Sequence, residues 1–397
     1  MKISKIIMPA ILLFSLDSLI KINLEDFRIH ISHLLLIIAM ALSAISTRKW
    51  LKQYARQNRT IIFLLIYLSL HAFIATDLKT YIVVLSYFIL AIMTHAAIFT
   101  YANKINFNLF FKRTLTLLVA TGFAQYLLYV VFNYQISLGG LSDTYYIDGG
   151  SIANRMRGFF LEPNWYGLYL ASAFIGYIMT THEKRPSTLL IALSFTCLYL
   201  SENRLTLYFV LLSTSIFFYE KHAHKIQKHL LITVCLAPII FLLALTFSDT
   251  LSGAAGDDRS VSARSVTVLK TATYIEKNFS LPSLLFGNGL STWGEVAYQE
   301  NLSSRASPEK SKTSRDTSES YVVVFELGLV GAFLFFLDFY ATCNMTTKRT
   351  EKTQMIILVS LVFCAAFYYP TFYFMMYLAP YFAARTYCSP RSELRHV

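Results

Sequence analysis

Two arginines lie just before the start of a predicted helix. Arg155 and Arg157 precede Gly158, at which the backbone can turn freely, and Pro163 fixes the backbone dihedral that the first turn of a helix requires. A helix is therefore predicted to begin near Asn164. Its first N–H groups and the positive end of its dipole would face the arginines, which suits an anion such as a phosphate or a diphosphate. The alternative is an arginine pair at a membrane edge beside an ordinary helix cap.

Further charged residues stand outside the long apolar runs. Arg204 lies in a very short turn between two apolar segments, where a charge is costly unless it meets a partner or water. It could pair with Glu202 or Asp143, or it could bind an anion. Arginine suits anion binding because its planar guanidinium pairs with two phosphate oxygens and keeps its charge. The other charged candidates are Arg259, Arg264, Glu162, Asp257, Asp258 and Glu319.

Several other kinds of chemistry have no support in the chain. No P-loop, GxSxG or HExxH motif is present, and none of the nine histidines lies in 138–164 or 249–320. The five cysteines are odd in number and lack CxxC spacing, so neither a disulfide nor a metal site is predicted. No cofactor is expected.

The composition is that of a membrane protein. Of the 397 residues 55% are hydrophobic and 15% are charged, whereas soluble domains contain about 25% charged residues. The net charge of +12 is better explained by basic loops than by binding to nucleic acid. We expect an all-α polytopic fold, a single transmembrane domain over 1–397 with about twelve spans. The predicted spans are 6–22, 30–46, 61–76, 80–101, 114–136, 165–181, 188–201, 205–219, 230–248, 321–341, 355–370 and 372–387.

The charges of the loops predict the orientation. Residues 48–59 contain five basic and no acidic side chains, and the alternate loops 102–113, 182–187, 220–229 and 342–354 are also basic. Both termini are therefore predicted to be cytoplasmic, the first span is read as retained, and Arg385 is counted among the inside charges.

Two larger loops are then external. They are 138–164, which contains the arginine motif, and 249–320, which contains a helix-compatible stretch around Arg264 and a serine-rich tract that is typical of a lid or tether. Helices that begin near Asn164, Arg204 and Tyr321 would all start on this outer face. Their positive dipole ends could thus converge with the arginines.

Four motifs follow one another in the chain. They are Arg155-Met-Arg-Gly158 through Pro163-Asn164, Ser201-Glu-Asn-Arg204, Arg264 followed by Phe286-Gly-Asn-Gly289, and Ser318-Glu319-Ser320-Tyr321 followed by Glu326-Leu-Gly328-Leu-Val-Gly331. In order and topology they resemble the motifs of the bacterial O-antigen polymerase (Wzy) and O-antigen ligase superfamily of membrane glycosyltransferases, over about residues 60–340. Asn203 stands where the family has serine. Ser318-Glu319 stands where ligases have His-Asn, which favours a polymerase.

The resemblance implies a metal-independent polymerase in the bacterial inner membrane that joins undecaprenyl-diphosphate-linked oligosaccharide repeats on the periplasmic side. The same lipid-linked oligosaccharide would be donor and acceptor, and membrane lipid, a chain-length regulator and a flippase are candidate partners. Arg155, Arg204 and Arg264 would stabilise the leaving diphosphate. Glu162 or Glu319 would act as base, or the diphosphate itself would accept the proton. The alternatives are a polysaccharide ligase and a non-enzymatic flippase. The expected substrate-binding residues are Arg157, Asn164, Arg259, Gly287, Gly289 and Tyr321.

Overall fold

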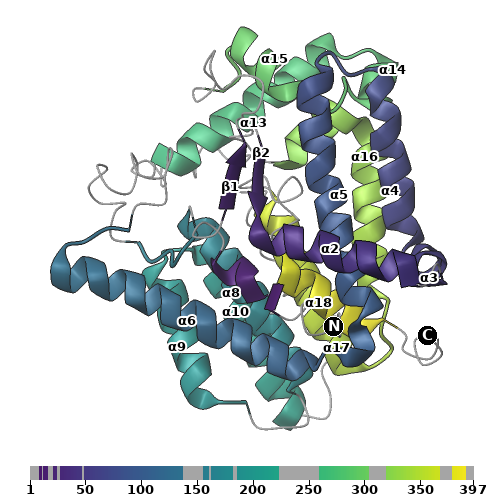
Figure 1. The fold of residues 1–397 in the computed structure, drawn as a ribbon. Coiled ribbons are helices and arrows are strands. Elements are labelled where there is room, and N and C mark those ends of the chain that lie inside the picture. The colour runs from purple at the N-terminus through teal and green to yellow at the C-terminus, as the bar shows by residue number, and fades with distance from the viewer. Residues whose placement is uncertain are drawn as a thin grey trace.

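In the computed structural model, the described residues form helices, their connections and one short hairpin (Figure 1). It describes residues 9–10, 12–16, 21–24, 27–46, 49–136, 155–160, 162–181, 186–222, 259–303, 319–366 and 378–389. The helices are α2 (Ile31–Ser46), α3 (Lys49–Gln57), α4 (Arg59–Leu70), α5 (Leu78–Thr100), α6 (Phe107–Phe132), α8 (Pro163–Thr180), α9 (Thr188–Leu200), α10 (Arg204–His222), α13 (Arg259–Asn278), α14 (Leu281–Phe286), α15 (Trp293–Gln299), α16 (Glu319–Cys343), α17 (Arg349–Ala365) and α18 (Ala379–Cys388). Short 3₁₀ turns are η1 (Phe14–Leu16), η2 (His71–Phe73) and η3 (Ala102–Lys104).

Short polar side chains set where the long apolar helices begin. Asp77 accepts hydrogen bonds from the first N–H groups of α5, Asn106 from the Leu109 N–H in α6, and Ser187 from the Leu190 N–H in α9. α6 ends at Asn133, whose φ of 49° is left-handed and stops the helix. Local sequence therefore fixes these ends.

Helix α8 is the centre of the core. All its residues from Tyr166 to Met179 are buried, and it packs against α6, α9, α10, α17 and α18. Small residues permit this close packing: a Cβ on Gly176 would lie 2.3 Å from the Phe111 ring. The helix that was expected to follow the arginine motif is thus enclosed on all sides by other helices.

Within the described residues, three helices are long and apolar enough to cross a membrane, namely α5, α6 and α16 from Tyr321 onward. Three shorter apolar helices cover Arg59–Phe73, Thr188–Leu200 and Arg204–Tyr219. The protein therefore has the apolar helices of a membrane protein. The predicted span 230–248 lies outside the described residues.

The predicted first span, 6–22, is not one helix. Within its described part η1 ends at Leu16, and strand β1 (Lys21–Leu24) begins before the range ends; β1 pairs antiparallel with β2 (Phe27–His30). Apolar and polar residues alternate along both strands, and only two residues separate them, which is a hairpin signal. The predicted first span is therefore corrected, while the all-α expectation holds for the rest of the described residues apart from this hairpin.

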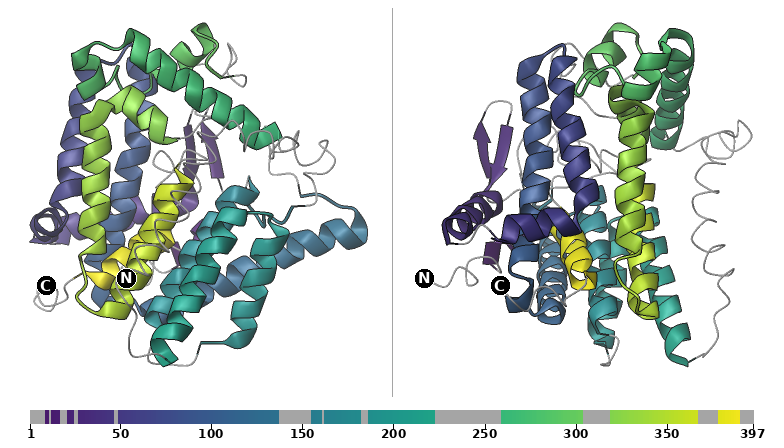
Figure 2. Two further views of the ribbon diagram at one scale, coloured as in Figure 1. Left: turned by 180° about the vertical axis from the view of Figure 1, so that it is seen from behind. Right: turned by 90° about the vertical axis from the view of Figure 1, so that its right-hand side faces the viewer.

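Helices α2 and α3 lie across the direction of α4, α5 and α16 (Figures 1 and 2). The predicted span 30–46 is thus a helix, but it is not aligned with its neighbours. α3 is held against α5 because the Tyr54 hydroxyl is hydrogen-bonded to His95 Nδ1 at 3.0 Å.

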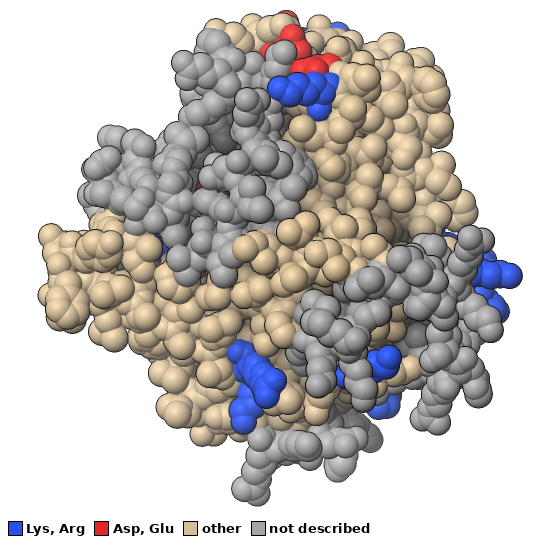
Figure 3. Space-filling model, in the orientation of Figure 1, with Lys and Arg blue, Asp and Glu red and all other residues tan. Residues whose placement is uncertain are grey.

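Large apolar side chains remain exposed along α4, α5, α6 and α16, among them Phe63, Val131, Phe132 and Phe333. In Figure 3 the charged side chains of one face lie near its top and in its lower half, with a broad uncharged surface between them. An exposed apolar surface of this kind suits contact with lipid.

A buried ion pair joins the ends of three helices. Arg385 of α18 and Asp338 of α16 make two parallel contacts, Nη1 to Oδ2 at 2.6 Å and Nη2 to Oδ1 at 2.8 Å, and their side chains are 1% and 7% exposed. Thr60 donates to Asp338 Oδ1 at 2.5 Å, and Arg385 Nη2 donates to Asn58 Oδ1 at 3.3 Å. Arg385, which was counted among the inside charges at the end of the last predicted helix, is instead a core residue, because a carboxylate within the bundle neutralises it.

We predict that Arg385→Met lowers the free energy of unfolding by about 3–5 kcal/mol, because it leaves Asp338 buried without its partner. The double variant Asp338→Leu/Arg385→Met should recover much of that loss. Thermal unfolding of the purified protein in detergent measures both. Lys112→Met, at an exposed position of α6, is the control and should unfold like the wild type. A single Arg385→Met variant with unchanged stability would contradict the assignment.

Candidate functional site

The arginine motif and the Arg204 turn come together in the structure. Arg155 donates from Nε and Nη2 to the Ser201 carbonyl at 3.0 and 2.8 Å. The Met156 N–H donates to the Leu200 carbonyl at 2.9 Å. Two motifs that are more than forty residues apart in the sequence therefore form one unit.

Arg155 also makes an ion pair, with 3.6 Å between its Nε and Glu202 Oε2. Glu202 has a left-handed φ of 54°, and its side chain is 67% exposed. From its position in the sequence Glu202 was a candidate partner for Arg204, but in the structure it pairs with Arg155. The other partner that was considered, Asp143, lies outside the described residues.

Arg157 points into the protein. Its residue exposure is 3%, its N–H donates to Gln125 Oε1 at 3.0 Å, and its Nη2 donates to the Ile136 carbonyl at 3.0 Å. These contacts fix the loop against α6 and the residues that follow it.

The turn after Arg157 requires glycine. Gly158 has a φ of +54°, and a Cβ there would lie 3.2 Å from the Tyr166 ring. The chain then becomes extended at Glu162, and α8 begins at Pro163. The predicted helix start near Asn164 is confirmed.

Helices α8 and α10 begin side by side. Asn203 Nδ2 donates to the Asn164 carbonyl at 3.2 Å, while Asn203 Oδ1 accepts from the Thr206 N–H at 3.3 Å. A Cβ on Gly167 would lie 2.8 Å from Asn203 Nδ2, so no larger residue fits between the helices without a shift. Asn203 thus caps α10 and ties its start to α8, and two positive helix ends are adjacent.

Arg204 is the first residue of α10 and is exposed. It makes neither an ion pair nor a hydrogen bond with any residue that the structure describes. Its guanidinium is therefore available to an anion at the place where two helices begin.

Arg259 and Arg264 lie on the first turns of α13, and Glu319 is the first residue of α16. The structure describes their backbone but not their side chains. In Figure 2 one end of α13 lies toward the helices α8 and α10, and its other end lies at α14. Tyr321 is half-buried near the start of α16, and Glu162 is exposed next to α8.

The Phe286–Gly289 turn packs directly on a break in α16. Gly328 interrupts that helix with a φ of 66° and a ψ of −171°. A Cβ on Gly287 would lie 2.1 Å from the Glu326 carbonyl oxygen, and one on Gly328 would lie 2.4 Å from the Leu285 carbonyl oxygen. The two glycine motifs are therefore one tightly packed junction.

Groups outside α16 bind the carbonyls at this break. The hydrogen bonds run from the Asn288 N–H to Phe325 O at 3.0 Å, from the Gly289 N–H to Glu326 O at 3.1 Å, and from the Tyr67 hydroxyl to Leu327 O at 2.6 Å. Glu326 is buried, and its Oε1 also accepts a hydrogen bond from the Trp293 N–H at 3.1 Å. From the sequence it was considered only as part of a motif. A single carboxylate in an otherwise apolar run could have indicated that it needs a buried partner. The backbone at Gly287 and Gly289 thus packs against other backbone, at the break in α16 and at Ile74.

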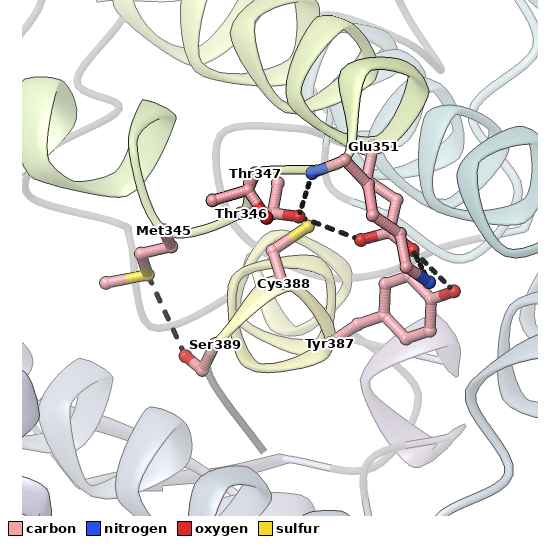
Figure 4. Close-up of a pocket in the computed structure, with 8 residues that line it drawn as sticks. Met345, Thr346, Thr347, Glu351, Tyr387, Cys388 and Ser389 are labelled. Atoms are coloured by element: carbon pink, nitrogen blue, oxygen red, sulfur yellow. Dashed lines mark hydrogen bonds and ion pairs between the residues drawn. The ribbon is translucent and has the colours of Figure 1, made fainter. Parts of the chain in front are cut away.

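A cavity of about 350 Å³ lies at the opposite end of α16, where its connection to α17 meets the end of α18 (Figure 4). Glu351, the one carboxylate among its described lining residues, accepts hydrogen bonds from Thr346 at 2.9 Å, Lys348 at 3.1 Å and Tyr387 at 3.3 Å. Because these polar groups satisfy one another, the cavity is not assigned as the site. Among the described residues no group of three or more His, Cys, Asp or Glu side chains could hold a metal ion.

Comparisons of the chain with protein-family models and with curated proteins found no match.

We predict that Gly287→Ala destabilises the protein by at least about 1–3 kcal/mol, because the new Cβ meets the Glu326 carbonyl and φ is +79°. The thermal midpoint in detergent measures the loss. Leu329→Ala, at an exposed position just beyond the break, is the matched control and should have a much smaller effect. Equal midpoints for the two variants would argue against the junction.

Proposed function

We propose that this protein is a membrane glycosyltransferase that joins oligosaccharide repeat units carried on undecaprenyl diphosphate, acting as a polymerase. The observation that carries the proposal is the junction of α8 and α10. There an exposed arginine without a partner among the described residues, Arg204, stands where two helices begin. A cation beside the positive ends of two helices is suited to a diphosphate.

The reaction explains why such a site is needed. A hydroxyl of one lipid-linked unit attacks the anomeric carbon of another, the bond from that carbon to the diphosphate oxygen breaks, and undecaprenyl diphosphate leaves. Negative charge grows on the leaving diphosphate in the transition state. Fixed cations and N–H groups aimed at it lower the barrier.

The contacts indicate different roles for Arg155 and Arg204. Arg155 donates two hydrogen bonds to the Ser201 carbonyl, so we assign it mainly to holding the turn that presents Arg204. Arg204 would bind the diphosphate directly. Arg157 holds the arginine loop against the core through its contacts with Gln125 and the Ile136 carbonyl.

The remaining residues complete the proposal. Arg264 and Arg259 would approach from α13, and Asn164 would present the start of α8. The hydroxyl proton would pass to Glu162, to Glu319 or to the diphosphate itself. Glu162 is exposed beside the arginine loop, which favours it by position. Gly287, Gly289 and Tyr321 would shape the outer end of α16 where the sugars are held.

The finer topology belongs to the same proposal. Cytoplasmic termini and external loops at 138–164 and 249–320 follow from the charges of the loops. A location in the bacterial inner membrane is what the resemblance implies. α8, α10 and α16 would then begin on the periplasmic side, where lipid-linked repeats are joined.

The glycans of a deletion strain test the function. A polymerase mutant should accumulate single repeat units on the final acceptor. Full-length chains that remain on the lipid carrier would instead indicate a ligase, and repeat units trapped inside the cell would indicate a flippase. Either of those outcomes would refute the proposed polymerase.

We predict that Arg204→Lys impairs polymerisation nearly as much as Arg204→Ala, with rates of a purified lipid-linked repeat lowered about 10²–10³-fold. A lysine cannot reproduce the paired contact of a guanidinium with two oxygens. Lys277→Ala, at an exposed cation of α13, is the control and should keep the wild-type rate. A normal rate from Arg204→Lys, at a normal protein level, would count against direct binding of the diphosphate.

A further inference from the structure

Three exposed basic side chains lie close together in sequence on α3 and at the start of α4. Lys52 and Arg56 are four residues apart in α3 and so share a face, and Arg59 is the first residue of α4. All three side chains are exposed. None makes an ion pair or hydrogen bond with a residue that the structure describes.

The opposite side of this segment is anchored in the core. Tyr54 is buried and is hydrogen-bonded to His95, and Asn58 accepts from the buried Arg385. Tyr54 lies two residues from Lys52 and from Arg56, on the other side of the helix. The segment therefore presents its cations outward from a fixed position.

The depth of this segment suits a lipid head group. His95, the contact of Tyr54, lies seventeen residues beyond the start of α5 at Leu78, which is about 26 Å along the helix. The hydrocarbon core of a bilayer is about 30 Å thick. With the start of α5 at one membrane surface, α3 lies near the other, and it runs across α4 and α5 as an interfacial helix does (Figure 1).

An apolar stripe continues from Arg59 along α4. Phe63, Ile66 and Leu70 are 58%, 53% and 55% exposed, and with Arg59 they are spaced by four, three and four residues. This spacing places all four on one face of the helix. The three basic side chains thus lie at one end of an apolar stripe on α4, along which an acyl chain can pack.

We infer that Lys52, Arg56 and Arg59 bind the phosphate head group of an anionic phospholipid whose acyl chain lies along Phe63, Ile66 and Leu70. The site is independent of the proposed transferase activity. It would couple the lipid composition of that leaflet to the packing of α3 and α4, because the same segment carries Tyr54 and Asn58.

The test uses the purified full-length protein in a nonionic detergent, titrated with phosphatidylglycerol and with phosphatidylcholine of identical acyl chains. The wild type should bind phosphatidylglycerol at least tenfold more tightly. K52Q/R56Q/R59Q should weaken that binding about 100-fold, because each cation contributes to attraction by anionic lipid. K52R/R56K/R59K, which keeps the charges, should retain the preference.

The matched control is K104Q/K112Q/R113Q, which removes three exposed basic side chains near the start of α6. It should keep the lipid preference. Equal loss in both triple variants, or none in the first, would overturn the inference. Displacement of the lipid by an equal concentration of inorganic phosphate would also overturn it, since the bound species would then be a soluble anion.

Discussion

A charge inside an apolar bundle must have a partner, and the Arg385–Asp338 pair is where this constraint organises the fold. Two parallel contacts neutralise both groups, and the side chains of Thr60 and Asn58 supply further hydrogen bonds. The pair therefore joins α16 and α18 to the segment where α3 passes into α4. Removing one partner would strand the other, which is costly in a medium of low polarity. The position of α3 across the bundle depends on this junction.

The same constraint acts on the backbone of α16. A break at Gly328 leaves peptide carbonyls that cannot stay unbonded within a membrane-facing helix. The Asn288 and Gly289 N–H groups and the Tyr67 hydroxyl bind them, which is possible only because glycines let the two chains approach. The break thus fixes α14 and α15 at one end of α16. Glycine motifs that suggested substrate contact serve, in the described contacts, to hold this end together.

At the junction of α8 and α10 the structure separates arginines that look alike in the sequence. Arg157 is enclosed, Arg155 is bonded to the Ser201 carbonyl, and Arg204 is exposed. The proposed diphosphate site and the inferred lipid site are built alike. In each, one side of a short segment is bonded to the core, and the other side carries exposed basic side chains. Anchoring limits the motion of the free guanidinium groups, so less entropy is lost when an anion binds.

The sequence by itself determined the apolar helices, the helix start at Pro163 and the placement of the polar motifs outside the long apolar runs, because these depend on local composition, proline geometry and capping. It did not determine the crosswise course of α2 and α3, the burial of Arg385 or the contact between Arg155 and the Arg204 turn. Those were decided by tertiary structure, since each depends on a partner distant in the chain: His95 for Tyr54, Asp338 for Arg385, and Ser201 for Arg155. Residue type tells which groups need a partner, and only packing decides which partner comes within about 3 Å.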